Sequence, residues 1–212
     1  NASACNLDIT AGVEVVGESA ELKYALITSP DLGVVATSGS VTITGTSILG
    51  AESYGVVSQS GGSVDLRSVV VAEAEGAGIW MGCGCDCATT FSAERVLVSD
   101  LRLVGLALDG AVADLDRMRI EQIRPSSSFA DGQGVAAFGC ADVSANAMHI
   151  DTTADAGIFV FLSTFAGTEL SVTRALRGMS VQEGADVSIA GFVASDNEAA
   201  GWLAARGPPL AL

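Results

Sequence analysis

Residues 33–50 read GVVATSGSVTITGTSILG, and this stretch decides the fold. A glycine opens it, apolar residues alternate after the glycine, and two pairs of spaced positions follow, Val41 with Ile43 and Thr46 with Ile48. Alternation with a period of two is typical of strands with one buried face. The two-residue break between the pairs shifts the phase, as a tight bend between two strands does. The stretch therefore predicts three short strands.

The same unit returns along the chain at intervals of 21 to 29 residues. A period in this range is the signature of a stacked array, in which one repeat cannot bury its apolar face without its neighbours. We expect one domain over residues 1–212, either complete or a segment of a longer solenoid. The glycines that open the units are Gly12, Gly33, Gly55, Gly78, Gly105, Gly134, Gly157, Gly178 and Gly201.

The predicted inward positions follow each glycine in the order apolar–x–apolar–x–x–apolar–x–apolar. The unit from Gly157 departs from this order, because Leu170, Val172 and Ala175 fit but Arg177 falls where an inward residue is expected. In the other units the predicted inward residues are Ala20, Leu22, Ala25 and Ile27; Val41, Ile43, Thr46 and Ile48; Val64, Leu66, Val69 and Val71; Val96, Val98, Leu101 and Leu103; Ala113, Leu115, Met118 and Ile120; Val143, Ala145, Met148 and Ile150; and Val187, Ile189, Phe192 and Ala194.

This repeat resembles that of the right-handed parallel β-helix proteins, the superfamily typified by pectate lyase. The resemblance covers the chain from about Gly12 to Trp202, rests on spacing and apolar phase, and includes no catalytic signature. It implies an all-β solenoid of about eight to nine coils with three short strands in each. A β-sandwich is the alternative, but it would not explain one motif repeated in one order.

Composition and charge argue against several functional classes. The chain carries 25 Asp and Glu against 10 Lys and Arg, and its net charge of −15 repels nucleic acid and anionic membrane surfaces. The longest apolar run, around residues 157–162, is strand-sized and far below the roughly 18 residues of a membrane span, so we expect no transmembrane segment. The chain begins at Asn1 without a leader and is poor in Lys but rich in Ser, Thr and Gly. These features predict a secreted or cell-surface protein, in processed form or as a fragment.

Three stretches interrupt the repeat and are predicted to be loop insertions. Residues 82–92 and residues 161–167 each lengthen the first turn of a coil, and residues 121–131 extend a closing turn. Interruptions of a solenoid either gather at one functional face or are tolerated surface insertions.

The cysteines suggest a cross-link in the first of these loops. Cys83, Cys85 and Cys87 alternate there, and Cys140 falls at a nearly equivalent corner two coils later. Two coils span about 10 Å, which exceeds the roughly 7 Å that a disulfide bridges between Cα atoms, but the longer loop gives Cys85 or Cys87 room to fold over. Disulfide pairing is the first interpretation, and a soft-metal site and free thiols are the alternatives. We expect no metal ion and no other cofactor.

The outward residues of the first strand predict an apolar stripe. Val35, Val57, Trp80 and Phe159 belong to a series that carries no charge between its first and last member. A contiguous apolar stripe marks a contact surface, here for a second copy or a protein partner. In the alternative interpretation, loops of the same chain fold over it.

The outward residues of the third strand predict a polar group. Arg102, Arg119 and His149 are expected in three successive coils, with Asp114 on the adjoining strand. In the resembled superfamily, members that cleave polysaccharides use clustered carboxylates, with calcium and a basic residue or as an acid and base pair. If the chain is an enzyme, these four residues are its expected catalytic set. Otherwise they form a solvated face with local ion pairs.

Neither end of the repeat shows an amphipathic capping helix, and an uncapped β-helix exposes strand edges that favour further pairing. The sequence therefore favours a non-catalytic structural or adhesive β-helix that associates with itself or with a protein partner. A polysaccharide-active lyase or hydrolase is the alternative.

Overall fold

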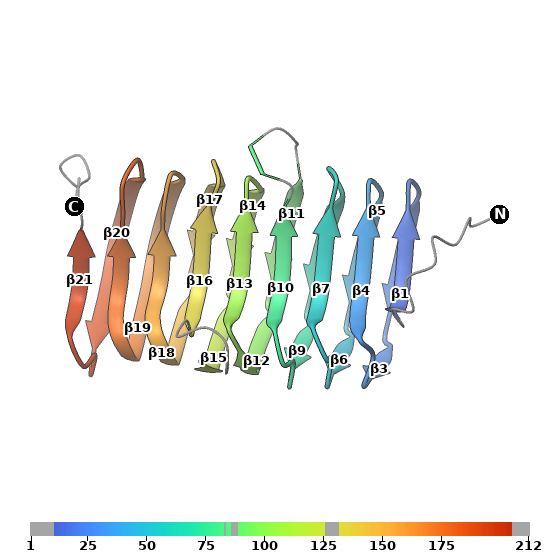
Figure 1. The fold of residues 1–212 in the computed structure, drawn as a ribbon, viewed down its shortest axis with the longest axis horizontal. Coiled ribbons are helices and arrows are strands. Elements are labelled where there is room, and N and C mark those ends of the chain that lie inside the picture. Colours follow the sequence, from blue (N-terminus) through green and yellow to red (C-terminus); the bar gives the residue numbers. More distant parts are fainter. Residues whose placement is uncertain (1–10, 83, 86–88, 126–131, 205–212) are drawn as a thin grey trace.

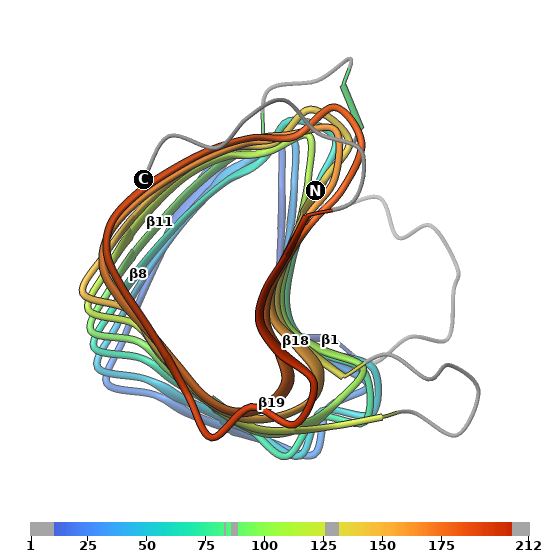
Figure 2. The same ribbon diagram turned by 90° about the vertical axis from the view of Figure 1, so that its left-hand side faces the viewer.

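The computed structural model describes residues 11–82, 84–85, 89–125 and 132–204, and within them the chain forms strands and turns only. The strands stack as a parallel β-helix of about eight turns (Figure 1). Seen from the C-terminal end, with the chain advancing toward the viewer, each turn runs counter-clockwise, so the helix is right-handed (Figure 2). The predicted fold is confirmed. No helix within the described ranges has the length and apolar character needed to cross a membrane.

Each turn contributes a strand to each of three faces, and each strand pairs in parallel with those one turn before and after it. The first face holds β1 (Ala11–Val16), β4 (Leu32–Thr37), β7 (Tyr54–Gln59), β10 (Ala77–Gly82), β13 (Val104–Asp109), β16 (Gln133–Phe138) and β21 (Ala200–Ala204). The second face holds β2 (Ser19–Lys23), β5 (Ser40–Thr44), β8 (Ser63–Arg67), β11 (Thr90–Glu94), β14 (Val112–Asp116) and β17 (Asp142–Asn146). The third face holds β3 (Leu26–Thr28), β6 (Ser47–Leu49), β9 (Val70–Ala72), β12 (Leu97–Arg102) and β15 (Arg119–Arg124).

Toward the C-terminal end, strand pairing continues around the corners. As a result β18 (His149–Val160) covers the third and first faces, β19 (Thr164–Val181) covers all three, and β20 (Asp186–Ser195) covers the second and third.

One residue with positive φ makes each bend between the second and third faces. Its N–H still donates to a carbonyl of the next turn, as from Arg95 to Asp116 at 3.0 Å, so the hydrogen-bond ladder continues through the bend. This conformation costs roughly 1–2 kcal/mol in a residue with a side chain, and the stacked hydrogen bonds hold it in place. The residues at this bend are Tyr24, Gly45, Ser68, Arg95, Arg117, Ala147, Glu169 and Gly191.

The interior of the rod is one continuous apolar core. Val41, Ile43, Thr46 and Ile48, the inward residues predicted from the opening stretch, are each at most 2% exposed. The hydroxyl of Thr46 accepts a hydrogen bond from the Ala25 N–H at 3.3 Å, so its polar atom has a partner inside the core. The predicted phase is confirmed for this turn.

The glycines that open the repeats lie in one column, where the third face turns into the first. A Cβ atom on Gly33 would lie 2.1 Å from the carbonyl oxygen of Gly55 in the next turn and 2.5 Å from the Cγ2 atom of Ile48. The two turns therefore leave no room for a side chain at this corner. The period read from the sequence is the period of this close approach.

In the turn that opens at Gly78, the predicted inward residues are shifted along the chain. Phe91 and Ala93 occupy the first pair of inward positions on β11, and Val96 and Val98 occupy the second pair. The prediction gave the first pair to Val96 and Val98 and was wrong in this turn. The segment between β10 and β11 is longer than in other turns, so the inward positions lie further from Gly78. The predicted positions therefore fell five residues too late in the sequence.

The turn that opens at Gly157 shows the same shift. Phe165 and Gly167 take the first pair of positions, and Leu170 and Val172 take the second. Arg177 therefore lies where β19 enters the first face, and it does not interrupt the core. Gly167 has no apolar side chain, which hid the first pair in the sequence.

The predicted insertions differ in outcome. Residues 83–89 separate β10 from β11 where residues 60–62 suffice between β7 and β8, so the first turn is lengthened there as predicted. An extension also separates β15 from β16, but it begins after Arg124, and residues 126–131 lie outside the described part. The predicted insertion over 161–167 is wrong, because β19 begins at Thr164 and pairs in register with β17.

Candidate functional site

The predicted outward residues of the first strand form a column on the first face. Each member pairs in register with the next along the rod, so the expected continuity is confirmed. The column reads Val35, Val57, Trp80, Ala107, Ala136 and Phe159. Its role as an interface stays a prediction.

A second apolar cluster, separate from the core, is built around this column. The indole ring of Trp80 stands at its centre, with its centroid 5.9 Å from the ring of Tyr54 and 5.9 Å from the ring of Phe138, both in edge-to-face geometry. Phe159 packs on the same cluster. We call Tyr54, Trp80, Phe138 and Phe159 the aromatic patch. The buried residues beneath it are Ala77, Val104, Ala107 and Ala136.

Small residues make the floor of the aromatic patch. Ala107 and Ala136 are 1% and 4% exposed, while Trp80 and Phe159 remain half-buried. The first face curves inward, so side chains on its outer surface converge (Figure 2). The predicted stripe is therefore covered in part by its own aromatic side chains. Val57, at 3% exposed, belongs to the packing beneath the surface and offers little area to a partner.

The carboxyl group of Asp109 borders the aromatic patch. Asp109 lies in register between Gly82 and Phe138 on the first face. Burial raises the pKa of the Asp109 carboxyl above its usual range. A carboxylate that has lost part of its hydration favours a hydrogen-bond donor or a cation placed against it. The rim of the patch is thus polar on this side.

A disulfide between Cys85 and Cys140 closes the corner beside the aromatic patch, with the two Cα atoms 5.3 Å apart. It links the loop after β10 to the turn after β16, two turns further on. The prediction that Cys85 or Cys87 folds over to reach Cys140 is confirmed for Cys85. Cys83 and Cys87 lie outside the described residues.

The turn between the two cysteines passes under the bridge at Gly110. A Cβ atom on Gly110 would lie 2.1 Å from the carbonyl oxygen of Gly84, so the loop rests directly on this backbone. The N–H of Gly84 also donates to the carbonyl of Asp109 at 3.3 Å. The loop is therefore part of the stack and covers the corner next to the patch.

The four residues of the predicted catalytic set lie on two faces. Arg119 and His149 are neighbours in one column of the third face. Asp114 lies on β14 of the second face. Arg102 stacks in register on Arg124 and not on Arg119, so its predicted place was wrong. The five-residue shift in its turn caused the error.

Charged or polar neighbours already engage three of these four side chains. Nε of Arg102 lies 2.9 Å from Glu75, and Nε of Arg119 lies 2.8 Å from Glu121. Nδ1 of His149 lies 2.7 Å from the Ser171 hydroxyl. Exposed pairs of this kind contribute little to stability. They give this face the character of a solvated surface with local ion pairs.

Asp114 instead lines a shallow depression of about 350 Å³ on the second face, with both polar and apolar residues in its lining. Asp65, Ser92, Asp114 and Ser144 form its central column, one residue from each of four successive turns. Arg67 is paired with Asp65 at 2.7 Å. Across the described residues, no three His, Cys, Asp or Glu side chains are grouped closely enough to hold a metal ion.

Sequence reasoning missed two rings of the aromatic patch, and it missed that Asp65 lies in one column with Ser92, Asp114 and Ser144 on the second face. Tyr54 stands one residue before an opening glycine, and Phe138 stands four residues after another. A reading of the residues on both sides of each outward position would have found them. Asp65 and Asp114 are two turns apart, and Ser92 of the turn between them joins their column because Phe91 pairs with Val64 and Ala113. The sequence motif was placed five residues too late in that turn, so this alignment was missed.

No known protein family and no curated protein matches the chain in sequence. Among solved structures, it is similar to HetL, a pentapeptide repeat protein involved in heterocyst differentiation regulation from the cyanobacterium Nostoc. The two chains are 16% identical, the alignment covers 89% of this chain and 87% of HetL, and the TM-score is 0.22. A score this low carries no argument about function. The chain is a right-handed parallel β-helix repeat protein, and its own residues must indicate what it does.

Proposed function

We propose that this protein is a non-catalytic structural or adhesive β-helix of the cell exterior, which associates through its aromatic patch with a second copy or a protein partner. The observation that carries this proposal is a group of four rings on the outer surface of the first face, separate from the core. Aromatic side chains at the centre of a well-packed patch dominate the binding energy of many protein interfaces. Trp80 has this position here.

The disulfide supports an exterior location, and the charge argues against two classes of partner. Disulfides persist in oxidising compartments and are rare in reducing ones, and the bridge from Cys85 to Cys140 is part of the folded rod. A net charge of −15 disfavours binding to nucleic acid and to anionic membrane surfaces. On so acidic a rod, the uncharged aromatic patch is the surface where a protein partner meets the least charge repulsion.

The placement of the polar residues favours a non-catalytic role over polysaccharide cleavage. An acid and base pair must flank one bond, with carboxyl groups roughly 5–9.5 Å apart. Asp114 lies on a different face from Arg119 and His149, and Arg119 is paired with Glu121. The four residues therefore do not surround a common substrate position.

Sedimentation of a patch variant tests the proposal. We expect the protein to associate at tens of micromolar. The Trp80→Ser, Phe159→Ser double variant should lose the contact made by the aromatic patch. Removal of one central aromatic residue costs about 2 kcal/mol or more in an interface, or roughly 30-fold in affinity. Val112→Ser is the matched control, because Val112 is 52% exposed on the second face. Equal association by the double variant and the control would contradict the proposal.

Incubation with uronate polymers, with and without calcium, tests the enzymatic alternative. We expect no release of unsaturated or reducing ends. Release that disappears in Asp114→Asn would establish polysaccharide cleavage and reject the non-catalytic role.

A further inference from the structure

The aromatic patch borders a half-buried carboxyl group, that of Asp109. Asp109 stands in register with Gly82 on one side and with Phe138 on the other, so it belongs to the middle of the first face. Within the described ranges, burial is the one effect that shifts its pKa, and neither a cation nor a hydrogen-bond donor lies against its carboxyl oxygens. A group that binds the patch therefore meets a carboxyl whose hydrogen-bonding capacity is free.

The indole of Trp80 and the side chain of Asp109 meet above Gly82. A Cβ atom added to Gly82 would lie 3.3 Å from Nε1 of Trp80 and 2.7 Å from the Cβ atom of Asp109. The two side chains therefore lean toward each other across the space that the glycine leaves. The rings of Tyr54 and Phe138 stand edge to face against Trp80, each with its centroid 5.9 Å away. Three rings and a carboxyl group thus border one surface.

This combination of groups suits an organic cation. A cation within about 6 Å of a ring centroid is attracted by the face of the ring, most strongly by that of Trp. A guanidinium group is planar and weakly hydrated, so it stacks on such a face, and it also donates two parallel N–H bonds to a carboxylate. A lysine ammonium is more strongly hydrated and gains less on a half-buried surface. The chemistry of the patch therefore favours arginine.

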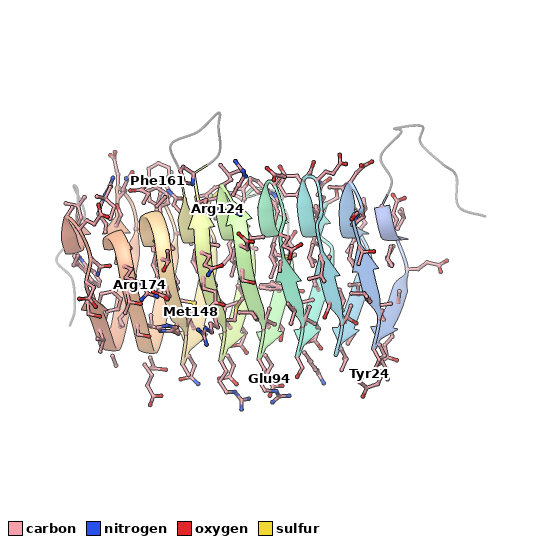
Figure 3. The ribbon with its side chains drawn as sticks, turned by 90° about the horizontal axis from the view of Figure 1, so that it is seen from below. Tyr24, Glu94, Arg124, Met148, Phe161 and Arg174 are labelled. Carbon is pink, nitrogen blue, oxygen red and sulfur yellow. A yellow bond between two sulfur atoms is a disulfide. The ribbon has the colours of Figure 1, made fainter. Side chains whose placement is uncertain are left out.

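The cations of the rod itself do not supply this group. All nine Lys and Arg side chains in the described part of the chain form ion pairs with its own carboxylates. Two of them are labelled in Figure 3, Arg124, which is paired with Asp100, and Arg174, which is paired with Asp151. A second copy would have to break such a pair to fill the site. A basic partner would not, and the net charge of −15 attracts it.

The free rod is less stable with this carboxyl than without it. Burial raises the pKa of Asp109, so its ionised form is disfavoured in the folded chain at neutral pH. A bound cation would stabilise that ionised form. Perturbed groups of this kind gather at binding sites, where function outweighs stability.

We propose that the aromatic patch binds an arginine side chain of a basic protein partner, with the guanidinium group stacked on Trp80 and paired with the Asp109 carboxylate. This inference rests on the proposed function and deepens it, because it names the group that a protein partner places on the patch.

Two short capped peptides test the proposal. One has a central arginine, and the other has citrulline in its place, which keeps the shape of the side chain but carries no charge. The titrations are followed by NMR at about 0.15 M salt, where exposed charges are largely screened beyond about 8 Å. We expect the arginine peptide to shift the indole N–H signal of Trp80 and to bind about tenfold more tightly than the citrulline peptide, or better.

Variants of the patch locate the binding site. Asp109→Asn should weaken binding of the arginine peptide about tenfold or more, because its charge-assisted hydrogen bonds are lost. Asp186→Asn is the matched control, since it removes the same charge from an exposed carboxyl of the second face, and it should bind the peptide as the parent does. The Trp80→Ser, Phe159→Ser variant should not bind it.

Three results would overturn the proposal. They are equal binding of the two peptides, no binding of either at millimolar concentration, and equal weakening by Asp109→Asn and Asp186→Asn, which would show attraction to net charge alone. Sedimentation of the protein alone separates these failures from failure of the proposed function. If the patch variant loses self-association while the arginine peptide does not bind the parent, the proposed function stands and this inference falls.

Discussion

Gly105→Ala is expected to destabilise the rod by about 2 kcal/mol or more. The added Cβ atom would lie 2.6 Å from the carbonyl oxygen of Gly134 and 2.6 Å from the Cγ2 atom of Ile120. An ordinary contact begins near 3.4 Å, and the oxygen is backbone, so two turns must part by nearly an ångström to relieve the overlap. Overpacking costs about 1–3 kcal/mol, and a weakened ladder bond adds to it. The reduced freedom of the unfolded chain offsets only about 0.4–1 kcal/mol.

The assay is thermal unfolding followed by circular dichroism. For a chain of this length, 1 kcal/mol shifts the melting temperature by about 2–4 °C, so a fall of about 4–8 °C is expected. Gly17→Ala is the matched control, because nothing lies within 4 Å of its added Cβ atom although its φ is +67°. That variant should lose only about 1 kcal/mol, from backbone strain. If Gly105→Ala is as stable as Gly17→Ala, the column does not require glycine for space.

Three further predictions concern the disulfide and two carboxyl groups. Cys85→Ser, Cys140→Ser should lose about 2–4 kcal/mol in chemical denaturation, and alkylation without reduction, read by mass spectrometry, should leave both cysteines of the parent unmodified. Asp109→Asn should stabilise the protein at neutral pH, because burial raises the pKa of this carboxyl and so disfavours its ionised form in the folded state. This gain in stability over the parent should disappear as the pH falls below about 4, where the carboxyl is protonated in the unfolded state too. The pKa of Asp116 is lowered chiefly by a hydrogen bond from Asn146. The ionised Asp116 carboxylate therefore stabilises the fold above about pH 4, and this effect is lost as the pH falls through the lowered pKa. Asn146→Ala should raise this pKa in an NMR titration, and an unchanged pKa would contradict the assignment.

The fold was predictable because two requirements repeat in every turn. The corner glycine is required by the close approach of two backbones, and the alternation is required by one shared core, so both leave a regular trace in the sequence. Register was less predictable where a turn has a longer loop or lacks an apolar side chain. Phe91 and Gly167 stand at those places, and a shift of five residues there moved Arg102 into the wrong column.

The aromatic patch was predictable only in part, for a related reason. Its central column follows from alternation on one strand, which placed Trp80 and Phe159 on the outer surface. Its other two rings come from neighbouring columns, and the curvature of the first face decides that Tyr54 and Phe138 lean toward Trp80. Curvature is a property of the whole stack and leaves no local signal.

The bridge from Cys85 to Cys140 affects how the rod comes apart. In a solenoid each turn contacts only its neighbours, so unfolding can begin at an end and advance one turn at a time. This bond skips a turn and holds the one at Gly110 beneath it. Fraying that enters from either terminus meets, near the middle of the stack, three turns that must open together. The rod is thereby divided into two arms that can unravel independently while the stapled centre stays wound.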